Sequence, residues 1–385
     1  MKNTFALING CVYTGDAILR KHAVMIENGK ITGTPSLSYV PKGLQTVDLN
    51  GGIVAPGFID AQVNGGGGVL FNDDPTPEAL ATIAKAHERY GTLHWCPTVI
   101  TASLDTMEQC LKAVKASMGA GIGVIGTHLE GPYLSNARPG VHDTEFIRPA
   151  TSGEIHRLLT TGQGAISLVT VAPESAGEAY IKLFTDADIQ VFLGHTDAPC
   201  VIAEAAFAAG VTGVTHLYNA MSQMTGREPG VVGAALSMNS IWAGIIADGI
   251  HVDWLSVKLA KGLKKKRLFL VTDAMPPVGK PDAVYTIGGK EIVCKDGRCA
   301  TADGTLAGSA LDMATAVRNC VDHCGIELDE ALRMASAYPA EMLGVANRLG
   351  YIRPGYEADL VFLDEGVNVT GIMRGGKKVA FTPQP

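Results

Sequence analysis

Short apolar runs alternate with helical patterns through the middle of the chain. Eight of these runs have the length of a strand, and helical stretches such as residues 198–209 lie between them. The runs cover residues 53–62, 94–101, 124–130, 166–172, 191–195, 214–216, 241–247 and 268–273. Strands that alternate with helices indicate a parallel sheet with crossover connections, and eight such units predict a TIM-like (β/α)8 barrel.

The two ends of the chain have a different pattern, with short strands and tight turns. Asn28-Gly29 follows an apolar run and predicts a hairpin, because both residues of such a turn must tolerate positive φ. Apolar runs at 359–363 and 369–373 are separated by a turn in the same way. We therefore predict an α/β protein in which residues 1–53 and 350–385 form a small β-sandwich domain and residues 54–349 form the barrel.

Composition and charge narrow the functional class. The 385 residues are 46% apolar and 18% charged, which is typical of a compact enzyme. A net charge of −7 argues against a nucleic-acid partner. No apolar run is long enough to span a membrane, and no signal peptide follows Met1. These features predict a cytoplasmic protein without a membrane partner.

Two groups of residues are expected to have no part in the chemistry. The eight cysteines are predicted to be reduced thiols, as is usual in a chain without a signal peptide. Neither Cys294 with Cys299 nor Cys320 with Cys324 has the spacing of a zinc site. The basic run at 264–267 is expected to be a solvated helix end.

Polar side chains stand at the ends of four predicted strands. They are Glu130, His195, His216 and Asp273. Active sites of (β/α)8 barrels lie at the carboxyl ends of the strands, so these four are expected to converge. Two imidazoles and a carboxylate make a catalytic metal set that leaves one position for water. Asp273 is then the natural general base, whereas the alternative for it is a helix cap.

Other residues near the strand ends are candidates with open alternatives. His128 precedes Glu130 by two positions and is expected to be a core or supporting histidine without a clear role. His142 lies in the loop after the third strand, where it is either inert or a donor to an oxyanion. Arg227 and His251 lie in loops over the barrel mouth and suit a phosphate or carboxylate, surface decoration being the alternative.

The strand-end motifs resemble those of a known family. They are Pro56-Gly57-Phe58-Ile59-Asp60, His128-Leu129-Glu130-Gly131-Pro132, Gly194-His195-Thr196, Thr215-His216-Leu217-Tyr218-Asn219-Ala220-Met221, Gly226-Arg227-Glu228-Pro229-Gly230, Ala247-Asp248-Gly249-Ile250-His251 and Val271-Thr272-Asp273-Ala274. In this order, over essentially the whole chain, they resemble the N-acetylglucosamine-6-phosphate deacetylases of the amidohydrolase superfamily.

The resemblance implies a role for each matching residue. Glu130, His195 and His216 would bind one divalent metal, zinc or alternatively iron, and Asp273 would be the catalytic acid–base. His142 would polarise the scissile carbonyl of a phosphorylated amino sugar. The other expected substrate contacts are Val141, Asn219, Ala220, Arg227, His251, Leu306, Ala307 and Gly308. The resemblance further implies a homodimer or a dimer of dimers, in which Arg227 reaches the phosphate bound by the neighbouring subunit.

One feature departs from the two-metal members of the superfamily. Their first strand usually ends in His-x-His, and this chain has Gln62-Val63-Asn64 there. Amide side chains are poor zinc ligands, and Ala172-Pro173-Glu174 lacks the bridging lysine of many relatives, so a mononuclear site is expected.

The resemblance implies hydrolysis of the acetamide of N-acetylglucosamine 6-phosphate. A cyclic-amide or deaminating hydrolase on the same barrel and a non-catalytic scaffold are the rival readings.

Overall fold

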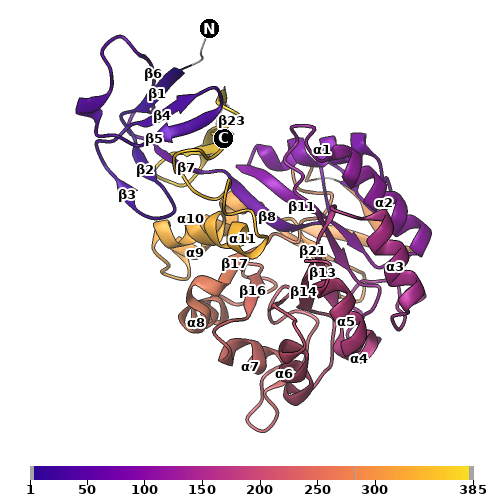
Figure 1. Ribbon diagram of the computed structural model, residues 1–385. Helices are drawn as coiled ribbons and strands as arrows, with labels where there is room; N and C mark the ends of the chain where they lie inside the picture. Colours follow the sequence, from indigo (N-terminus) through magenta and orange to yellow (C-terminus); the bar gives the residue numbers. More distant parts are fainter. Residues whose placement is uncertain (1–3, 282, 381–385) are drawn as a thin grey trace.

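The centre of the protein is an eight-stranded parallel sheet rolled into a barrel (Figure 1). The structure is a computed structural model that describes residues 4–281 and 283–380. The strands of the barrel, in spatial order, are β8 (Phe58–Val63), β11 (Thr92–Ile100), β12 (Thr127–Glu130), β13 (Ile166–Val171), β14 (Gln190–Leu193), β15 (Gly213–Val214), β16 (Trp242–Ile245) and β17 (Leu268–Leu270). A parallel bridge between Val63 and Ala274 joins the two edges. The predicted (β/α)8 barrel is confirmed.

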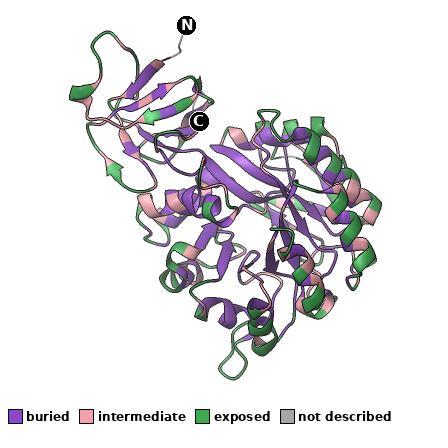
Figure 2. Cartoon of the chain, viewed as in Figure 1, coloured by how far each residue is buried: buried purple, intermediate pink, exposed green. Residues whose placement is uncertain are grey.

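Helices surround the barrel and turn their apolar faces to the strands (Figure 2). They are α1 (Pro77–Glu88), α2 (Leu104–Ser117), α3 (Ser152–Thr161), α4 (Pro173–Ala176), α5 (Glu178–Thr185), α6 (Cys200–Ala208), α7 (Gly230–Ser237), α8 (Trp254–Lys264), α9 (Met313–Asp322), α10 (Leu328–Met334) and α11 (Ala337–Met342). Side-chain caps explain several of their starts, such as Thr76 on α1 and Ser103 on α2, since these oxygens accept otherwise unpaired backbone N–H groups. No helix of the described residues has the length and apolar character needed to cross a membrane.

The prediction of a single first strand over residues 53–62 is wrong. The run forms two strands in two different sheets, β7 (Ile53–Pro56) in the small domain and β8 in the barrel. Gly57 separates them, its N–H donating to Asp359 O, and a β-carbon there would collide with the Leu93 side chain. Both strands are fully buried, so hydrophobicity alone gives no sign of the change of sheet.

Both ends of the chain contribute to the small domain, which has two sheets. One has the order β5-β4-β1-β6 and the other β24-β23-β22-β7-β2-β3. The strands are β1 (Thr4–Ile8), β2 (Cys11–Tyr13), β3 (Ile18–Leu19), β4 (Val24–Glu27), β5 (Lys30–Gly33), β6 (Gln45–Asp48), β22 (Leu360–Leu363), β23 (Val369–Arg374) and β24 (Lys377–Ala380). Side chains of both sheets, among them Ile26 and Phe362, share one apolar core.

The hairpin predicted at Asn28-Gly29 is confirmed. It joins β4 to β5, with φ of 50° and 79° at the two turn residues. The boundaries predicted for the small domain stay a prediction, and residues 1–3 and 381–385 lie outside the described part of the chain.

A four-stranded antiparallel sheet follows the last barrel strand. It contains β18 (Tyr285–Ile287), β19 (Lys290–Lys295), β20 (Arg298–Ala300) and β21 (Leu306–Ser309). Cys294 and Cys299 are directly opposite each other in β19 and β20, and they form a disulfide. The expectation that all cysteines are reduced is therefore wrong for this pair, because the hairpin register brings the two sulfurs together.

The basic run is only partly a solvated helix end. Lys264, the last residue of α8, is buried, and its Nζ donates to Ala235 O at 2.8 Å and Met238 O at 2.5 Å. The Arg267 guanidinium lies over the Trp242 ring at 4.1 Å from its centre. Only Lys265 and Lys266 are exposed as predicted. The run contains a structural lysine because the end of α8 lies against carbonyl groups at the carboxyl end of α7, those of Ala235 and Met238.

Candidate functional site

The barrel mouth holds a cavity of about 400 Å³ into which the predicted strand-end residues converge. Glu130 is the last residue of β12, His195 follows β14 and His216 follows β15. Glu130 Oε1 lies 3.2 Å from His195 Nε2 and 2.9 Å from His216 Nε2, and the two imidazole nitrogens are 3.1 Å apart. Asp273 lines the same cavity.

The chemistry of this triad fits a divalent cation. The Arg138 carbonyl can only accept, so His195 Nδ1, 3.0 Å away, carries a hydrogen and leaves the Nε2 lone pair facing Glu130 and His216. A backbone carbonyl that fixes the outer nitrogen in this way is typical of histidine metal ligands. All three side chains are buried. Their lone pairs lie close together, and this arrangement costs free energy unless a cation lies between them. Burial would raise the pKa of Glu130, but the two imidazoles hold it well below its usual range.

Asp273 is held from one side by two amide groups. Asn64 Nδ2 donates to Asp273 Oδ1 at 2.6 Å, and Gln62 Nε2 donates to the same oxygen at 3.1 Å. Gln62 Nε2 also lies 3.2 Å from both carboxylate oxygens of Glu130. Burial and the nearby Glu130 charge raise the pKa of Asp273 to about 6. A carboxylate with a pKa near neutrality suits proton transfer in both directions.

Three of the four converging residues have a strained backbone. The φ angles are 48° at His195, 33° at His216 and 53° at Asp273, a region that residues other than glycine rarely adopt. Hydrogen bonds hold the strained turn at Asp273, where its N–H donates to Gln62 O and its carbonyl accepts from Ser309 N. Such strain persists only where the surrounding structure enforces it, and it is concentrated at functional sites.

His142 lines the cavity next to Glu130, His195 and His216. Its ring centre is 4.3 Å from that of His195, and its Nδ1 lies 2.8 Å from Thr101 Oγ1 and 3.3 Å from Thr101 N. Burial and the neighbouring His195 lower the pKa of His142 to about 3, so the ring is neutral at ordinary pH. Val141 lines the cavity beside it.

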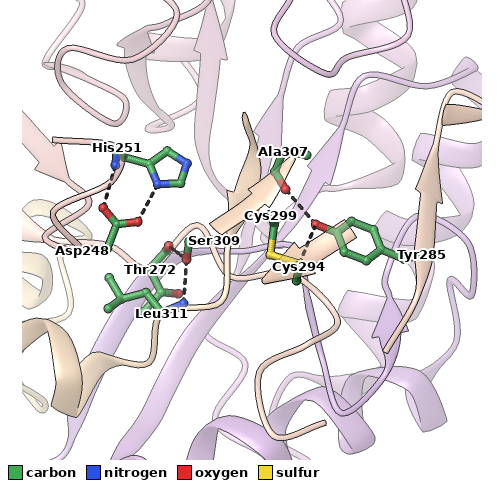
Figure 3. Close-up of a disulfide and its surroundings, with 9 residues drawn as sticks. All are labelled: Asp248, His251, Thr272, Tyr285, Cys294, Cys299, Ala307, Ser309 and Leu311. Atoms are coloured by element: carbon green, nitrogen blue, oxygen red, sulfur yellow. Dashed lines mark hydrogen bonds and ion pairs between the residues drawn. A yellow bond between two sulfur atoms is a disulfide. The ribbon is translucent and has the colours of Figure 1, made fainter. Parts of the chain in front are cut away.

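The candidate sugar contacts are placed as follows. Asn219, Ala220 and His251 line the cavity. His251 Nδ1 lies 2.6 Å from Asp248 Oδ2, and Asp248 Oδ1 accepts from the backbone N–H of His251 (Figure 3). The backbone N–H of Ile250 donates to the same oxygen. This buried pair fixes the direction of the His251 ring, because Asp248 is itself tied to the turn that carries the histidine.

The segment 306–308 faces the cavity in part. Leu306 and Gly308 line it, whereas Ala307 is fully buried in a separate apolar cluster and does not. The Ala307 carbonyl accepts from Tyr285 OH at 2.9 Å (Figure 3). The Ala307 side chain is directed away from the cavity, since alternate residues of β21 point to opposite faces, and Ala307 as a substrate contact stays a prediction.

Arg227 does not lie in the cavity of its own chain. It is exposed in the loop between β15 and α7, as are its neighbours Met224 and Glu228. The Glu228 carboxylate accepts from Cys200 N at 2.8 Å and Gly230 N at 2.9 Å, which anchors the loop next to Arg227. The loop thus has a defined course, and the Arg227 side chain on it is exposed.

His128 lies outside the cavity and inside the barrel. It is fully buried, with Nε2 at 2.7 Å from Thr170 Oγ1 and Nδ1 at 3.2 Å from Thr98 Oγ1. Burial lowers its pKa to about 4. The expectation of a core histidine is therefore met.

A second group of potential metal-binding side chains joins the barrel to the small domain. It contains His94, Glu357 and Asp359. His94 Nε2 is paired with Asp359 Oδ2 at 2.9 Å, and Glu357 with Arg348 at 3.2 Å. Each member already has a protein partner, so this group is an ion-pair network between the two parts of the chain.

Sequence reasoning gave no role to Thr101, Asp248 or Met275, which help to shape the cavity. Thr101 contacts His142, Asp248 contacts His251, and Met275 lines the wall next to Asp273. Thr101 and Asp248 stand at or just after predicted strand ends, the same signal that singled out Glu130 and Asp273. The partner of Thr101 could not be predicted, because it depends on how loops from different strands meet, whereas Asp248 and His251 lie in one turn.

The chain belongs to the amidohydrolase family, which matches residues 53–379. Residues 4–54 match a second family, the NagA composite domain. The N-acetylglucosamine-6-phosphate deacetylase of Haemophilus influenzae (strain ATCC 51907 / DSM 11121 / KW20 / Rd) is 37% identical over 377 residues, covering 97% of this chain and 98% of the relative. The N-acetylgalactosamine-6-phosphate deacetylase of Escherichia coli O157:H7 is 37% identical over 372 residues, covering 96% and 97%.

Solved structures agree with these relationships. The crystal structure of N-acetylglucosamine-6-phosphate deacetylase from Pasteurella multocida has a TM-score of 0.95 and 37% identity, covering 98% of this chain and 100% of that one. An enamidase of the amidohydrolase superfamily has a TM-score of 0.64 at 15% identity, covering 98% and 96%, and therefore shares the fold. The likeness to the deacetylases thus extends over both parts of the chain.

Proposed function

We propose that this protein hydrolyses the acetamide of N-acetyl-D-glucosamine 6-phosphate to D-glucosamine 6-phosphate and acetate, in the breakdown or recycling of amino sugars. The observation that carries the proposal is the buried triad of Glu130, His195 and His216 beside Asp273, in a barrel whose close relatives are sugar-phosphate deacetylases. The rival readings, a cyclic-amide or deaminating hydrolase and a non-catalytic scaffold, gain no support from these relatives.

Glu130, His195 and His216 would hold one divalent cation, with zinc the proposed metal and iron the alternative. When bound, such a cation supplies Lewis-acid chemistry, acidifying water and polarising a carbonyl. A second cation is not expected, because Gln62 and Asn64 offer amide groups that already donate to Asp273 and Glu130.

The two other catalytic residues would act on the proton and on the carbonyl. Asp273 takes a proton from the attacking water and then gives it to the amine nitrogen, so that the C–N bond breaks and a neutral amine leaves. His142 remains neutral and donates a hydrogen bond to the carbonyl oxygen while negative charge develops there. Val141, Asn219, Ala220, Leu306 and Gly308 line the space for the sugar ring.

The phosphate would be held by His251 of one subunit and Arg227 of its neighbour in a homodimer or dimer of dimers. The support for this is that Arg227 is exposed on an anchored loop outside its own cavity. Exposed apolar side chains occur on the loop and on helices near it in the sequence, namely Val201 on α6, Met224 in the loop, and Leu255, Leu259 and Leu263 on α8. An exposed apolar surface of this kind is typical of a subunit interface. A cytoplasmic location remains part of the proposal.

An acetate-release assay tests the proposal directly. Purified protein is assayed with N-acetylglucosamine 6-phosphate before chelation, after chelation and after return of zinc or iron(II). Activity that is lost on chelation and restored by metal supports the proposal. A folded, metal-loaded sample that releases no acetate from this substrate would contradict it.

The same assay defines the sugar. N-acetylgalactosamine 6-phosphate differs at a single hydroxyl group, and unphosphorylated N-acetylglucosamine lacks the anchor for Arg227 and His251. We expect the highest kcat/KM for N-acetylglucosamine 6-phosphate and a poor rate without the phosphate. A higher kcat/KM for the galacto sugar would correct the substrate while leaving the reaction unchanged.

A further inference from the structure

Thr101 connects the end of strand β11 with His142, and no catalytic role has been given to it above. It follows Ile100, the last residue of β11, and is buried. Both of its polar groups face the same imidazole nitrogen. Thr101 Oγ1 lies 2.8 Å from His142 Nδ1, and the backbone N–H of Thr101 donates to that nitrogen at 3.3 Å.

These contacts define the tautomer of His142. A backbone N–H can only donate, so Nδ1 must offer its lone pair and cannot carry a hydrogen. The hydroxyl of Thr101 is then the second donor, because its oxygen lone pairs at 2.8 Å would repel that of Nδ1. The single hydrogen of the neutral ring is therefore on Nε2. With Nδ1 turned toward Thr101, Nε2 is the nitrogen left for the cavity that His142 lines.

Thr101 also lies against the strand that carries Glu130. Its Oγ1 is 3.3 Å from the Glu130 carbonyl oxygen, at the end of β12, and this longer contact competes with His142 Nδ1, 2.8 Å away, for the single hydroxyl hydrogen. The next residue, Gly131, has a φ of 93°, and a β-carbon there would collide with Thr101 Oγ1. The glycine of the His128–Pro132 motif thus leaves room for the hydroxyl group. The position of His142 relative to Glu130 is thereby determined by a side chain that touches both.

We propose that Thr101 is a positioning residue, which holds His142 as the Nε2–H tautomer and directs that hydrogen toward the carbonyl oxygen of the acetamide. The inference rests on the proposed function, in which His142 stabilises the oxyanion. The opposite tautomer would place a lone pair against the developing negative charge, and a rotated ring would move the donor away from it. Thr101 thus acts through His142 and has no contact with the substrate.

The first test compares Thr101→Val and Thr101→Ser in the metal-loaded enzyme. Valine keeps the size of the side chain and removes the hydroxyl, whereas serine keeps the hydroxyl. We expect Thr101→Val to lower kcat by roughly 5- to 30-fold with KM little changed, because one hydrogen bond is lost. Thr101→Ser should retain most of the activity. Equal losses in both variants, or full activity of Thr101→Val, would overturn the proposal.

The second test asks whether Thr101 acts through His142. In the His142→Gln background, the additional change Thr101→Val should lower kcat less than about twofold, because residues that act as a unit are not additive. An undiminished additional loss would show that Thr101 acts by another route, such as the Glu130 carbonyl. Unchanged metal content and circular dichroism confirm that the variants are folded.

The third test does not depend on turnover. Nitrogen NMR of protein labelled with ¹⁵N-histidine, with the His142 signals assigned by their loss in His142→Gln, distinguishes a protonated from an unprotonated Nδ1. We expect Nδ1 to be unprotonated and Nε2 to be protonated. A protonated Nδ1 would overturn the tautomer. If the wild-type protein released no acetate, the proposed function would fail, while this measurement would still decide the tautomer.

Discussion

Asn64 donates to Asp273 Oδ1 at 2.6 Å, and Gln62 adds a second hydrogen bond to the same oxygen at 3.1 Å. One carboxylate oxygen therefore holds the side chain in place, and the other is left for proton transfer. Both amides follow from the first barrel strand, and they donate to the residue proposed as the general base.

Asp273→Asn should preserve the fold and metal binding but lower kcat by at least about 100-fold. The amide oxygen of asparagine can still accept from Asn64 and Gln62, which places the NH₂ group where the proton-transfer oxygen was. General acid–base groups typically contribute 10²–10⁴ to the rate, and an amide cannot take the proton. Retention of more than a tenth of wild-type turnover would show that Asp273 has a different role.

One tightly bound metal ion per chain is expected after extensive dialysis, measured by elemental analysis. Substitution of His195 or His216 by Asn should remove the ion and abolish acetate release, because both nitrogens converge on Glu130. His94→Asn is the matched control, since it removes a buried histidine next to a carboxylate away from the cavity. Two ions per chain, or loss of metal from the His94 variant, would contradict the mononuclear site.

Arg227→Ala should lower kcat/KM for the phosphorylated sugar by roughly 30- to 150-fold. A charge-assisted and often bidentate contact with phosphate is worth about 2–3 kcal/mol, which corresponds to this ratio. The rate with unphosphorylated N-acetylglucosamine should barely change, because that substrate has no phosphate for Arg227 to contact.

Subunit mixing tests whether Arg227 serves the neighbouring site. Asp273→Asn and Arg227→Ala chains are exchanged, and each mixed dimer then has one site with an intact Asp273 and an Arg227 from its partner. Activity above that of either parent is expected. Absence of recovery after confirmed exchange would mean that Arg227 serves its own subunit or does not bind phosphate.

Lys264→Met should lower the stability of the fold, although Lys264 does not line the cavity at the barrel mouth. The change removes the two hydrogen bonds from Lys264 to Ala235 O and Met238 O, of which Met238 O keeps a second donor in Ile241 N, at a cost of about 1–3 kcal/mol. Lys266→Met, an exposed neighbour, should leave the thermal midpoint unchanged. Equal midpoints for the two variants would show that burial of Lys264 contributes nothing to stability.

The barrel and the convergence of its strand-end residues could be predicted because both depend on local patterns. Eight buried strands with helices between them restrict the topology, and the carboxyl ends of parallel strands lie on one side of a barrel. Glu130, His195, His216 and Asp273 were therefore expected to meet. This prediction could be made without knowing which side chains touch.

Other features depend on contacts between distant segments and could not be predicted. The division of residues 53–62 into two strands depends on where Gly57 meets Asp359 and Leu93. The pairing of Thr101 with His142 depends on the course of a loop. The Cys294–Cys299 disulfide required the exact hairpin register, which a short polar sequence leaves open.

The small domain is made from strands that are separated in the chain by the whole barrel. Strand β7 pairs with β2 before the barrel and with β22 after it, where Val54 is opposite Phe362. During synthesis, β7 is therefore made long before its second neighbour, and one edge stays unpaired while the barrel is completed. Contacts over such a distance form slowly, and an open apolar edge invites aggregation. The order of synthesis thus leaves this edge of β7 open to aggregation until residues 360–363 have been made.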